Sequence, residues 1–189
     1  KLSKFEVYDD MFPSRREGIN AWVSIMRGCD KFCTFCIVPF TRGRERSRSE
    51  DSIIREVEVA VLNGFVEITL LGQNVNSYRT ENGKFPNLLE AVSAVQGVKR
   101  IRFMSPHPQD MDEHLLQVIS EHKNICNYIH LPLQAGSDRI LNRMNRTYTK
   151  GNYFSIVDNI REYLPDCSIS TDIIVGFPGE TEGEFEETL

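Results

Sequence analysis

The fold of this chain is restricted most by one stretch, Trp22-Val23-Ser24-Ile25-Met26-Arg27-Gly28-Cys29-Asp30-Lys31-Phe32-Cys33-Thr34-Phe35-Cys36. Its first part, residues 22–26, reads as a strand. The second part spaces three cysteines as Cys-x-x-x-Cys-x-x-Cys. Three thiolates leave one metal position open, whereas four would close a structural zinc site or an electron-transfer cluster. The stretch therefore predicts a strand that runs into a metal-binding loop where a reacting molecule can also bind.

Two other interpretations of the cysteines remain open. They could form a zinc knuckle, or Cys33 and Cys36 could act as a redox pair. Zinc needs a fourth ligand, and the next cysteine or histidine along the chain is His107, far outside the spacing of zinc ribbons and fingers. A structural disulfide is disfavoured because the five cysteines of the chain are an odd and sparse set.

Composition places the chain among globular proteins. Of its 189 residues, 40% are hydrophobic and 26% are charged, so we expect a soluble, cytoplasmic protein with no membrane contact. The net charge of −5 gives no overall attraction to nucleic acid, so any RNA contact has to be local. Since the chain begins without methionine, we expect residues 1–20 to be an entry segment from a preceding domain and residues 21–189 to be a truncated catalytic core.

Strand-like and helix-like segments alternate along the chain. We expect strands over 22–26, 66–71, 100–104, 127–131 and 168–175, and helices over 49–64, 87–96, 111–121 and 149–164. Thr181 and Glu184 have the spacing of a capping box and predict a further helix. This alternation predicts an α/β fold with five parallel strands in sequence order, joined by right-handed crossovers.

Polar or glycine-containing residues follow every expected strand. In parallel β/α folds the chemistry lies at the carboxyl ends of the strands, because the βα loops meet there. The segments concerned are Arg27-Gly28-Cys29, Gly72-Gln73-Asn74, Ser105-Pro106-His107-Pro108, Pro132-Leu133-Gln134 and Gly176-Phe177-Pro178-Gly179-Glu180. We therefore expect one rim of the sheet to hold the functional site.

The cysteine spacing, with an aromatic residue before the third cysteine, resembles the radical S-adenosylmethionine (radical SAM) superfamily. Further segments narrow the resemblance to the methylthiotransferases: residues 37–48 (Ile-Val-Pro-Phe-Thr-Arg-Gly-Arg-Glu-Arg-Ser-Arg), 70–78 (Leu-Leu-Gly-Gln-Asn-Val-Asn-Ser-Tyr), 105–108 (Ser-Pro-His-Pro) and 130–134 (His-Leu-Pro-Leu-Gln). The match covers nearly all of the chain from Trp22 onward. The resemblance implies a partial (β/α)6-type barrel.

The resemblance also implies cofactors and the residues that bind them. Cys29, Cys33 and Cys36 would ligate a [4Fe-4S] cluster whose fourth iron binds SAM. Residues 173–180 resemble an element that supports the SAM adenine, although Thr171 stands where that element has its first glycine. Gln134 and Arg146 are candidates for the SAM ribose and carboxylate. The full set of expected SAM-binding residues is Phe35, Gly72, Gln73, Asn74, Ser105, Gln134, Arg146, Val175 and Gly176.

The segment over 70–78 resembles the branch of the family that methylthiolates C2 of N6-isopentenyladenosine beside the tRNA anticodon. The resemblance implies tRNA as substrate, an external electron donor, and a second cluster in a preceding domain that takes part in sulfur donation. Other branches act on threonylcarbamoyladenosine in tRNA or on a ribosomal-protein aspartate, and the Gln73-Asn74-Val75-Asn76 segment argues against both.

The dense basic stretch of the chain contains Arg42, Arg44, Arg46 and Arg48. In an extended segment these alternating side chains would point to a common side, which suits RNA phosphates. The alternative is a solvated loop whose arginines pair with nearby carboxylates. A different class of function also stays open, namely a non-catalytic metal-binding module that recognises RNA through these arginines.

Overall fold

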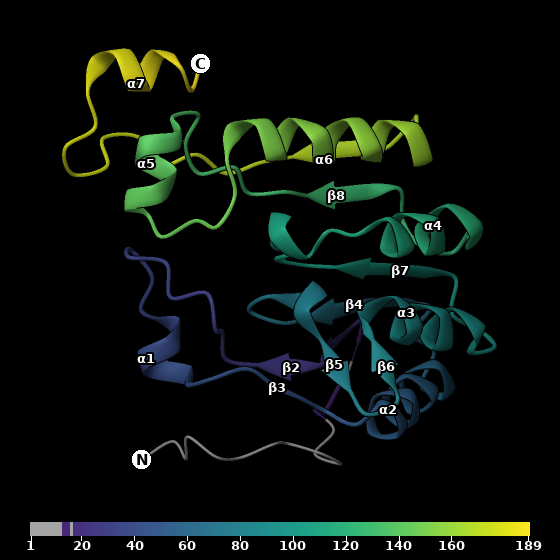
Figure 1. Cartoon of the computed structure of the whole chain (residues 1–189). Coiled ribbons are helices and arrows are strands. Elements are labelled where there is room, and N and C mark those ends of the chain that lie inside the picture. The colour runs from purple at the N-terminus through teal and green to yellow at the C-terminus, as the bar shows by residue number, and fades with distance from the viewer. Residues whose placement is uncertain (1–12, 16) are drawn as a thin grey trace.

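The computed structural model describes residues 13–15 and 17–189. Most of the expected entry segment, residues 1–20, lies outside the described residues. The described chain is an α/β structure in which strands and helices alternate, as the sequence predicts (Figure 1).

A parallel sheet forms the frame of the molecule. Its first three strands run parallel in the order β1-β4-β7, and a second parallel pair is formed by β8 and β9. A parallel bridge between Ile101 and Ile125 joins the two groups just before β8 begins. The five strands are β1 (Asn20–Ser24), β4 (Glu67–Leu71), β7 (Arg100–Phe103), β8 (Tyr128–His130) and β9 (Ser168–Ser170). The prediction of five parallel strands in sequence order is confirmed.

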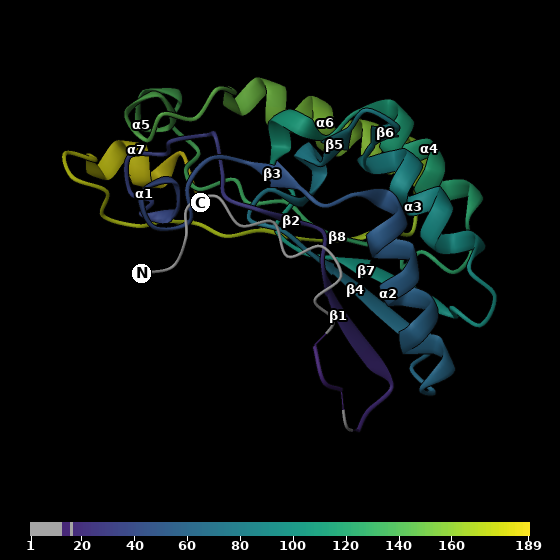
Figure 2. The same cartoon turned by 90° about the horizontal axis from the view of Figure 1, so that it is seen from below.

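Four longer helices follow strands and pack on the same face of the sheet (Figure 2). Each buries one apolar stripe; in the first of them Ile53, Val57 and Ala60 are buried while Glu58 is exposed. The four helices are α2 (Glu50–Leu62), α3 (Phe85–Ala94), α4 (Glu113–Glu121) and α6 (Lys150–Tyr163).

Shorter elements lie in the βα loops. Three are single-turn or two-turn helices, α1 (Val38–Arg42), α5 (Asp138–Arg143) and α7 (Glu182–Glu186), and two are 3-10 turns, η1 (Val75–Ser77) and η2 (Pro108–Asp110). Four short strands form two antiparallel pairs. In one pair β2 (Met26–Arg27) lies against β3 (Arg46–Ser47), and in the other β5 (Arg79–Thr80) lies against β6 (Gly83–Lys84). The capping box that predicts a helix after Thr181 is present at the start of α7.

The two faces of the sheet differ in what covers them. In β1, Ala21 and Val23 are fully buried under the helices, while Trp22 between them is 54% exposed on the opposite face. Trp22 pairs in register with Thr69 of β4. A parallel sheet with helices on one face and an open inner face is the geometry of an incomplete barrel.

The fifth strand is shorter than predicted. Regular pairing ends at Ser170, and an isolated parallel bridge between Gln134 and Ile173 continues the contact toward the rim. In the described part of the chain no helix has the length and apolar character that crossing a membrane requires.

Candidate functional site

The three cysteines lie on a loop between β2 and α1, which we call the cysteine loop (residues 28–37). All three thiols are free and half-buried, and the backbone N–H of Cys36 donates to the carbonyl of Cys33 at 3.0 Å. Burial raises the pKa of the Cys29 thiol, and the negative charges of Glu45, Cys33 and Cys36 raise it further. Three thiolates at this place therefore need a cationic partner, which bound iron supplies.

One side of the cysteine loop is fixed by the segment that follows β4. The backbone N–H of Gly28 donates to Oε1 of Gln73 at 2.6 Å, and the N–H of Cys29 donates to the carbonyl of Gly43 at 3.2 Å. Gly28 has a φ of +82°, and a Cβ at this position would lie 2.1 Å from the carbonyl oxygen of Arg44. Only glycine fits this close crossing of two backbone segments.

The opposite side of the loop is held by the turn between α5 and α6. The N–H of Thr34 donates to the carbonyl of Met144 at 3.1 Å. The side-chain amide of Asn145 donates to the carbonyls of Lys31 and Phe32 at 3.1 and 3.0 Å. The cysteine loop is thus clamped between segments that are far apart in the sequence.

Arg146 lies directly against the cysteine loop. Its Nη1 donates to Sγ of Cys33 at 3.7 Å, and its guanidinium lies 5.9 Å from the ring centre of Phe35 and 5.5 Å from that of Tyr148. Its Nε is buried and has no hydrogen-bond partner within the described chain. A buried donor without a partner is costly, so this atom fits an anionic group of a bound molecule.

Asn74 lies on the same rim and is 1% exposed. Its amide nitrogen donates to Asp110 at 2.9 Å and to Glu45 at 3.3 Å, while its Oδ1 is buried without a partner among the described residues. Asp110 also pairs with Lys31 of the cysteine loop at 2.8 Å. The free oxygen of Asn74 therefore fits a donor such as an ammonium group.

These features fit a four-iron cluster with SAM. The amino group of SAM can donate to Oδ1 of Asn74, and its carboxylate can accept from Nε of Arg146. Within the described residues no three His, Cys, Asp or Glu side chains gather around one point as ligands of a single metal ion do. A cluster does not require such a gathering, since each cysteine ligates a different iron.

Other residues expected to contact SAM lie along the same rim. A Cβ on Gly72 would lie 2.6 Å from Cγ of Met26, so the Met26 side chain would have to move to accommodate it. Gln134 is buried and has a φ of +75°, whereas Ser105 is exposed with a φ of +60°. Their SAM contacts stay predictions.

The segment after β9 carries two more of the expected residues. Val175 is 64% exposed, and the N–H of Gly176 donates to the carboxylate of Glu180 at 2.7 Å. The Oε1 of Gln73 already accepts from Gly28, so we leave that atom out of the proposed SAM contacts.

The four arginines of the basic stretch do not share one side, contrary to the expectation for an extended segment. Arg42 ends α1 and is exposed, and Arg44 is exposed and pairs with Asp30 at 2.7 Å. Arg46 is half-buried in β3, and one of its Nη atoms donates to the carbonyl of Arg42 at 3.2 Å. Arg42 and Arg44 are therefore exposed, whereas Arg46 lies half-buried in a short strand.

Arg48 lies inside the molecule. It is 6% exposed and pairs with Glu56 of α2 at 2.6 Å, and Arg15 pairs with the other oxygen of that carboxylate. The hydroxyl of Tyr78 donates to the carbonyl of Arg48 at 2.8 Å. Arg48 therefore ties the basic stretch to α2, and we leave it out of any RNA contact.

His107 and His130 act as packed polar groups, whereas His114 is exposed on α4. Burial, together with the charges of Arg146 and Lys31, lowers the pKa of His107 to about 3. Its neutral Nδ1 accepts from the N–H of Gln109 at 3.2 Å. His130 contacts Ser170 and Asp172 across β8 and β9 at 2.8 and 3.2 Å.

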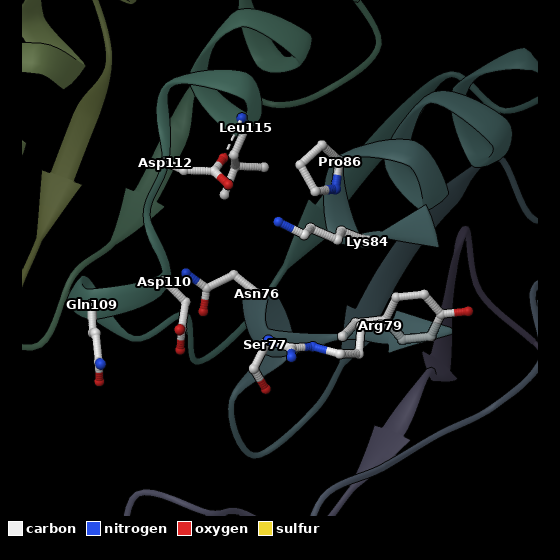
Figure 3. A pocket seen from close by; sticks show the side chains of 10 residues that line it. Asn76, Ser77, Arg79, Lys84, Pro86, Gln109, Asp110, Asp112 and Leu115 are labelled. Carbon is white, nitrogen blue, oxygen red and sulfur yellow. Dashed lines mark hydrogen bonds between the residues drawn. The ribbon is translucent and has the colours of Figure 1, made fainter. Parts of the chain in front are cut away.

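A polar cavity of about 160 Å³ lies beside this rim, between the β5–β6 hairpin and the η2 turn (Figure 3). Lys84 points into it, and Asp112 and Asn76 line its walls. Asp110 lies on its wall and also pairs with Lys31 of the cysteine loop, so this cavity and the loop share one carboxylate.

Sequence reasoning missed Asn145, which holds the cysteine loop, and Tyr148, whose ring lies against Arg146. The available signal was their place beside Arg146, in a polar segment between two helices. The remaining cysteines, Cys126 and Cys167, lie just before β8 and β9, at the end of the sheet opposite the rim, as the sequence predicts.

The geometry agrees with comparisons to known proteins. The sequence model of the radical SAM superfamily matches residues 23–189. The chain belongs to the radical SAM superfamily. Members of this superfamily use a [4Fe-4S] cluster and SAM, so the cofactor prediction is confirmed at the level of the family.

Two relatives carry the name tRNA-2-methylthio-N(6)-dimethylallyladenosine synthase. The protein from Thermodesulfovibrio yellowstonii is 51% identical over 93% of this chain and 41% of its own length. The one from Porphyromonas gingivalis is 53% identical over 100% of this chain and 42% of its own length. The chain thus spans about two fifths of the length of these relatives.

Solved structures share the fold. The cobalamin-dependent radical SAM enzyme OxsB with SAM bound superposes with a TM-score of 0.71 at 14% identity, over 88% of this chain and 25% of that one. The radical SAM methyltransferase TsrM from Kitasatospora setae gives a TM-score of 0.68 at 18% identity, over 88% of this chain and 32% of that one.

Proposed function

We propose that this chain is the SAM-cleaving core of a tRNA methylthiotransferase that modifies C2 of N6-isopentenyladenosine beside the anticodon. The three half-buried thiols on the clamped loop carry this proposal. It is supported by relatives about half identical to the chain that are named for this modification. The alternative substrates, threonylcarbamoyladenosine or a ribosomal-protein aspartate, have no such support here.

Cys29, Cys33 and Cys36 would hold the cluster. When bound, the cluster and SAM together supply a 5′-deoxyadenosyl radical that takes the hydrogen from C2 of the substrate adenine. Asn74 and Arg146 would orient the amino and carboxylate groups of SAM through their two unpartnered buried atoms. The half-buried loop would limit the access of water to this site.

We propose that other groups supply the remaining parts of the reaction. We assign sulfur donation to a second cluster in a preceding domain, and reduction of the cluster to an external one-electron donor. We place the reaction in the cytoplasm, where tRNA is available. Residues 1–20 would connect that domain to the core over 21–189.

The test is anaerobic reconstitution of the chain with iron and sulfide, followed by counts of iron, sulfide and zinc. We expect four irons per chain, which is the content of one [4Fe-4S] cluster, and dithionite-dependent conversion of SAM to 5′-deoxyadenosine and methionine. Stoichiometric zinc without iron would instead support a non-catalytic metal-binding module. A cluster whose electron paramagnetic resonance spectrum does not change when SAM is added would also refute the proposal.

A further inference from the structure

The cysteine loop and α1 present an exposed surface made of two phenylalanines, an isoleucine and two arginines, which we call the aromatic–arginine surface: Phe32, Ile37, Phe40, Arg42 and Arg44. We infer that this surface binds the unpaired nucleotides that flank the reacting adenosine of the substrate RNA. The inference rests on the proposed function and adds residues that contact the substrate.

The apolar part of this surface is unusually exposed. Ile37 is 66% exposed, Phe40 is 65% exposed and Phe32 is 38% exposed. The rings of Phe32 and Phe40 meet edge to face, with centroids 6.2 Å apart. Large apolar side chains that gather on a surface in this way mark a contact with another molecule.

The polar part of the surface is cationic. The guanidinium of Arg44 lies 5.3 Å from the ring centre of Phe32 and pairs with Asp30. Arg42 is exposed at the end of α1 and makes no side-chain ion pair within the described residues. Two exposed arginines on a chain of net charge −5 give a local attraction for phosphate.

RNA fits this combination better than a protein partner does. Proteins that bind unpaired RNA stack bases on aromatic rings and on arginine planes, and contact phosphates with arginine. Phe32 lies on the same loop as the three cysteines, which places this surface beside the expected reaction centre, where nucleotides next to the reacting base would bind. An apolar protein partner would not need the arginines beside the rings.

Photo-crosslinking tests the inference even if binding is weak. A stem-loop RNA of the anticodon type, with a photoreactive uridine in its loop, is irradiated with the reconstituted chain, and the crosslinked peptide is identified by mass spectrometry. We expect crosslinks within residues 32–44. The same stem closed as a duplex is the control RNA and should crosslink much less. Crosslinks confined to other parts of the chain would overturn the inference.

Substitutions at Phe40 test stacking by fluorescence anisotropy. We expect Phe40→Ala and Phe40→Leu each to weaken stem-loop binding by about fivefold or more, and Phe40→Tyr to retain it. Phe154→Ala is the matched control, because Phe154 is 58% exposed on α6 and should not contribute. The Phe40→Leu variant keeps the apolar packing, so its loss of binding points to the ring itself.

Several outcomes would overturn the inference that the aromatic–arginine surface binds RNA. Equal RNA affinities of Phe40→Ala and Phe154→Ala would show that Phe40 does not contribute to binding. Full RNA binding by Phe40→Leu would show that an apolar side chain is sufficient and that the aromatic ring does not stack on a base. Absence of RNA binding by the wild-type chain would also overturn the inference. SAM cleavage by the wild-type chain is measured without RNA, so failure of that assay marks failure of the proposed function instead.

Discussion

Replacing Gly28 by alanine should prevent the cysteine loop from closing. Gly28 has a φ of +82°, which costs a residue with a side chain about 1–2 kcal/mol. The added Cβ would also lie 2.1 Å from the carbonyl oxygen of Arg44 and 2.6 Å from that of Gly43, so the two backbone segments must separate. Separation breaks the hydrogen bonds from Gly28 to Gln73 and from Cys29 to Gly43, worth about 0.5–1.5 kcal/mol each.

The sum is about 2–5 kcal/mol against the closed loop, which lowers its population by at least about tenfold. The substitution should destabilise the closed loop and leave the sheet intact, because neither of the two lost hydrogen bonds belongs to a strand pair. We expect Gly28→Ala to fold with wild-type circular dichroism but to bind much less iron after anaerobic reconstitution, with a weakened response of the cluster spectrum to SAM.

Two matched variants separate the causes. Gly64 has a φ of +89° with no heavy atom within 4 Å of an added Cβ, so Gly64→Ala carries the conformational cost without the clash. Gly183→Ala carries neither. Both should load iron normally. Full iron loading with an unchanged SAM response in Gly28→Ala would refute the close crossing of the two backbones as the feature that positions the cysteines.

Three further predictions follow from the same structure. Alanine at Cys29, Cys33 or Cys36 should abolish SAM cleavage, whereas Cys126→Ala should retain it, as measured by 5′-deoxyadenosine release. Glu56→Ala should lower the free energy of unfolding in urea by about 3–5 kcal/mol because it removes the carboxylate that neutralises the charge of the buried Arg48, while the exposed Glu58→Ala should change it by less than about 0.5 kcal/mol. His107 has a folded pKa lowered to about 3 from 6.5, so the unfolded chain binds a proton first as pH falls. Wild-type stability should therefore decrease below pH 6.5 by about 1.4 kcal/mol per pH unit relative to His107→Gln, and parallel curves for the two proteins would contradict this.

The frame of the molecule could be read from the sequence because its signals are local. Alternating strand and helix patterns fixed the five strands and their order, and the Thr181 capping box marked α7. Polar residues after each strand predicted the rim that carries Asn74 and Arg146. The triplet of cysteines located the loop itself, since ligand spacing is a property of the chain alone.

Of the two interpretations of the arginine stretch, neither predicted that Arg48 is buried, because its partner lies on the next helix. Arg48 pairs with Glu56, which lies on the buried stripe of α2 between Ile53 and Val57. A glutamate on an apolar stripe signals a buried cation nearby, and this signal was present in the sequence. The turn of Arg44 toward Asp30 had no comparable signal, because it depends on how the loop folds back on itself.

The contacts of the cysteine loop also explain why its closure depends on the folded sheet. Gln73 follows β4 and Asn145 follows α5, so the two clamps of the loop come together only when the parallel strands have paired in order. A short peptide with the same cysteine spacing lacks both clamps. The loop that carries the three thiols is therefore positioned by long-range contacts, and an atom added at Gly28 would clash with the backbone segment that crosses it. We therefore expect cluster binding in this chain to depend on sheet formation as well as on the local cysteine spacing.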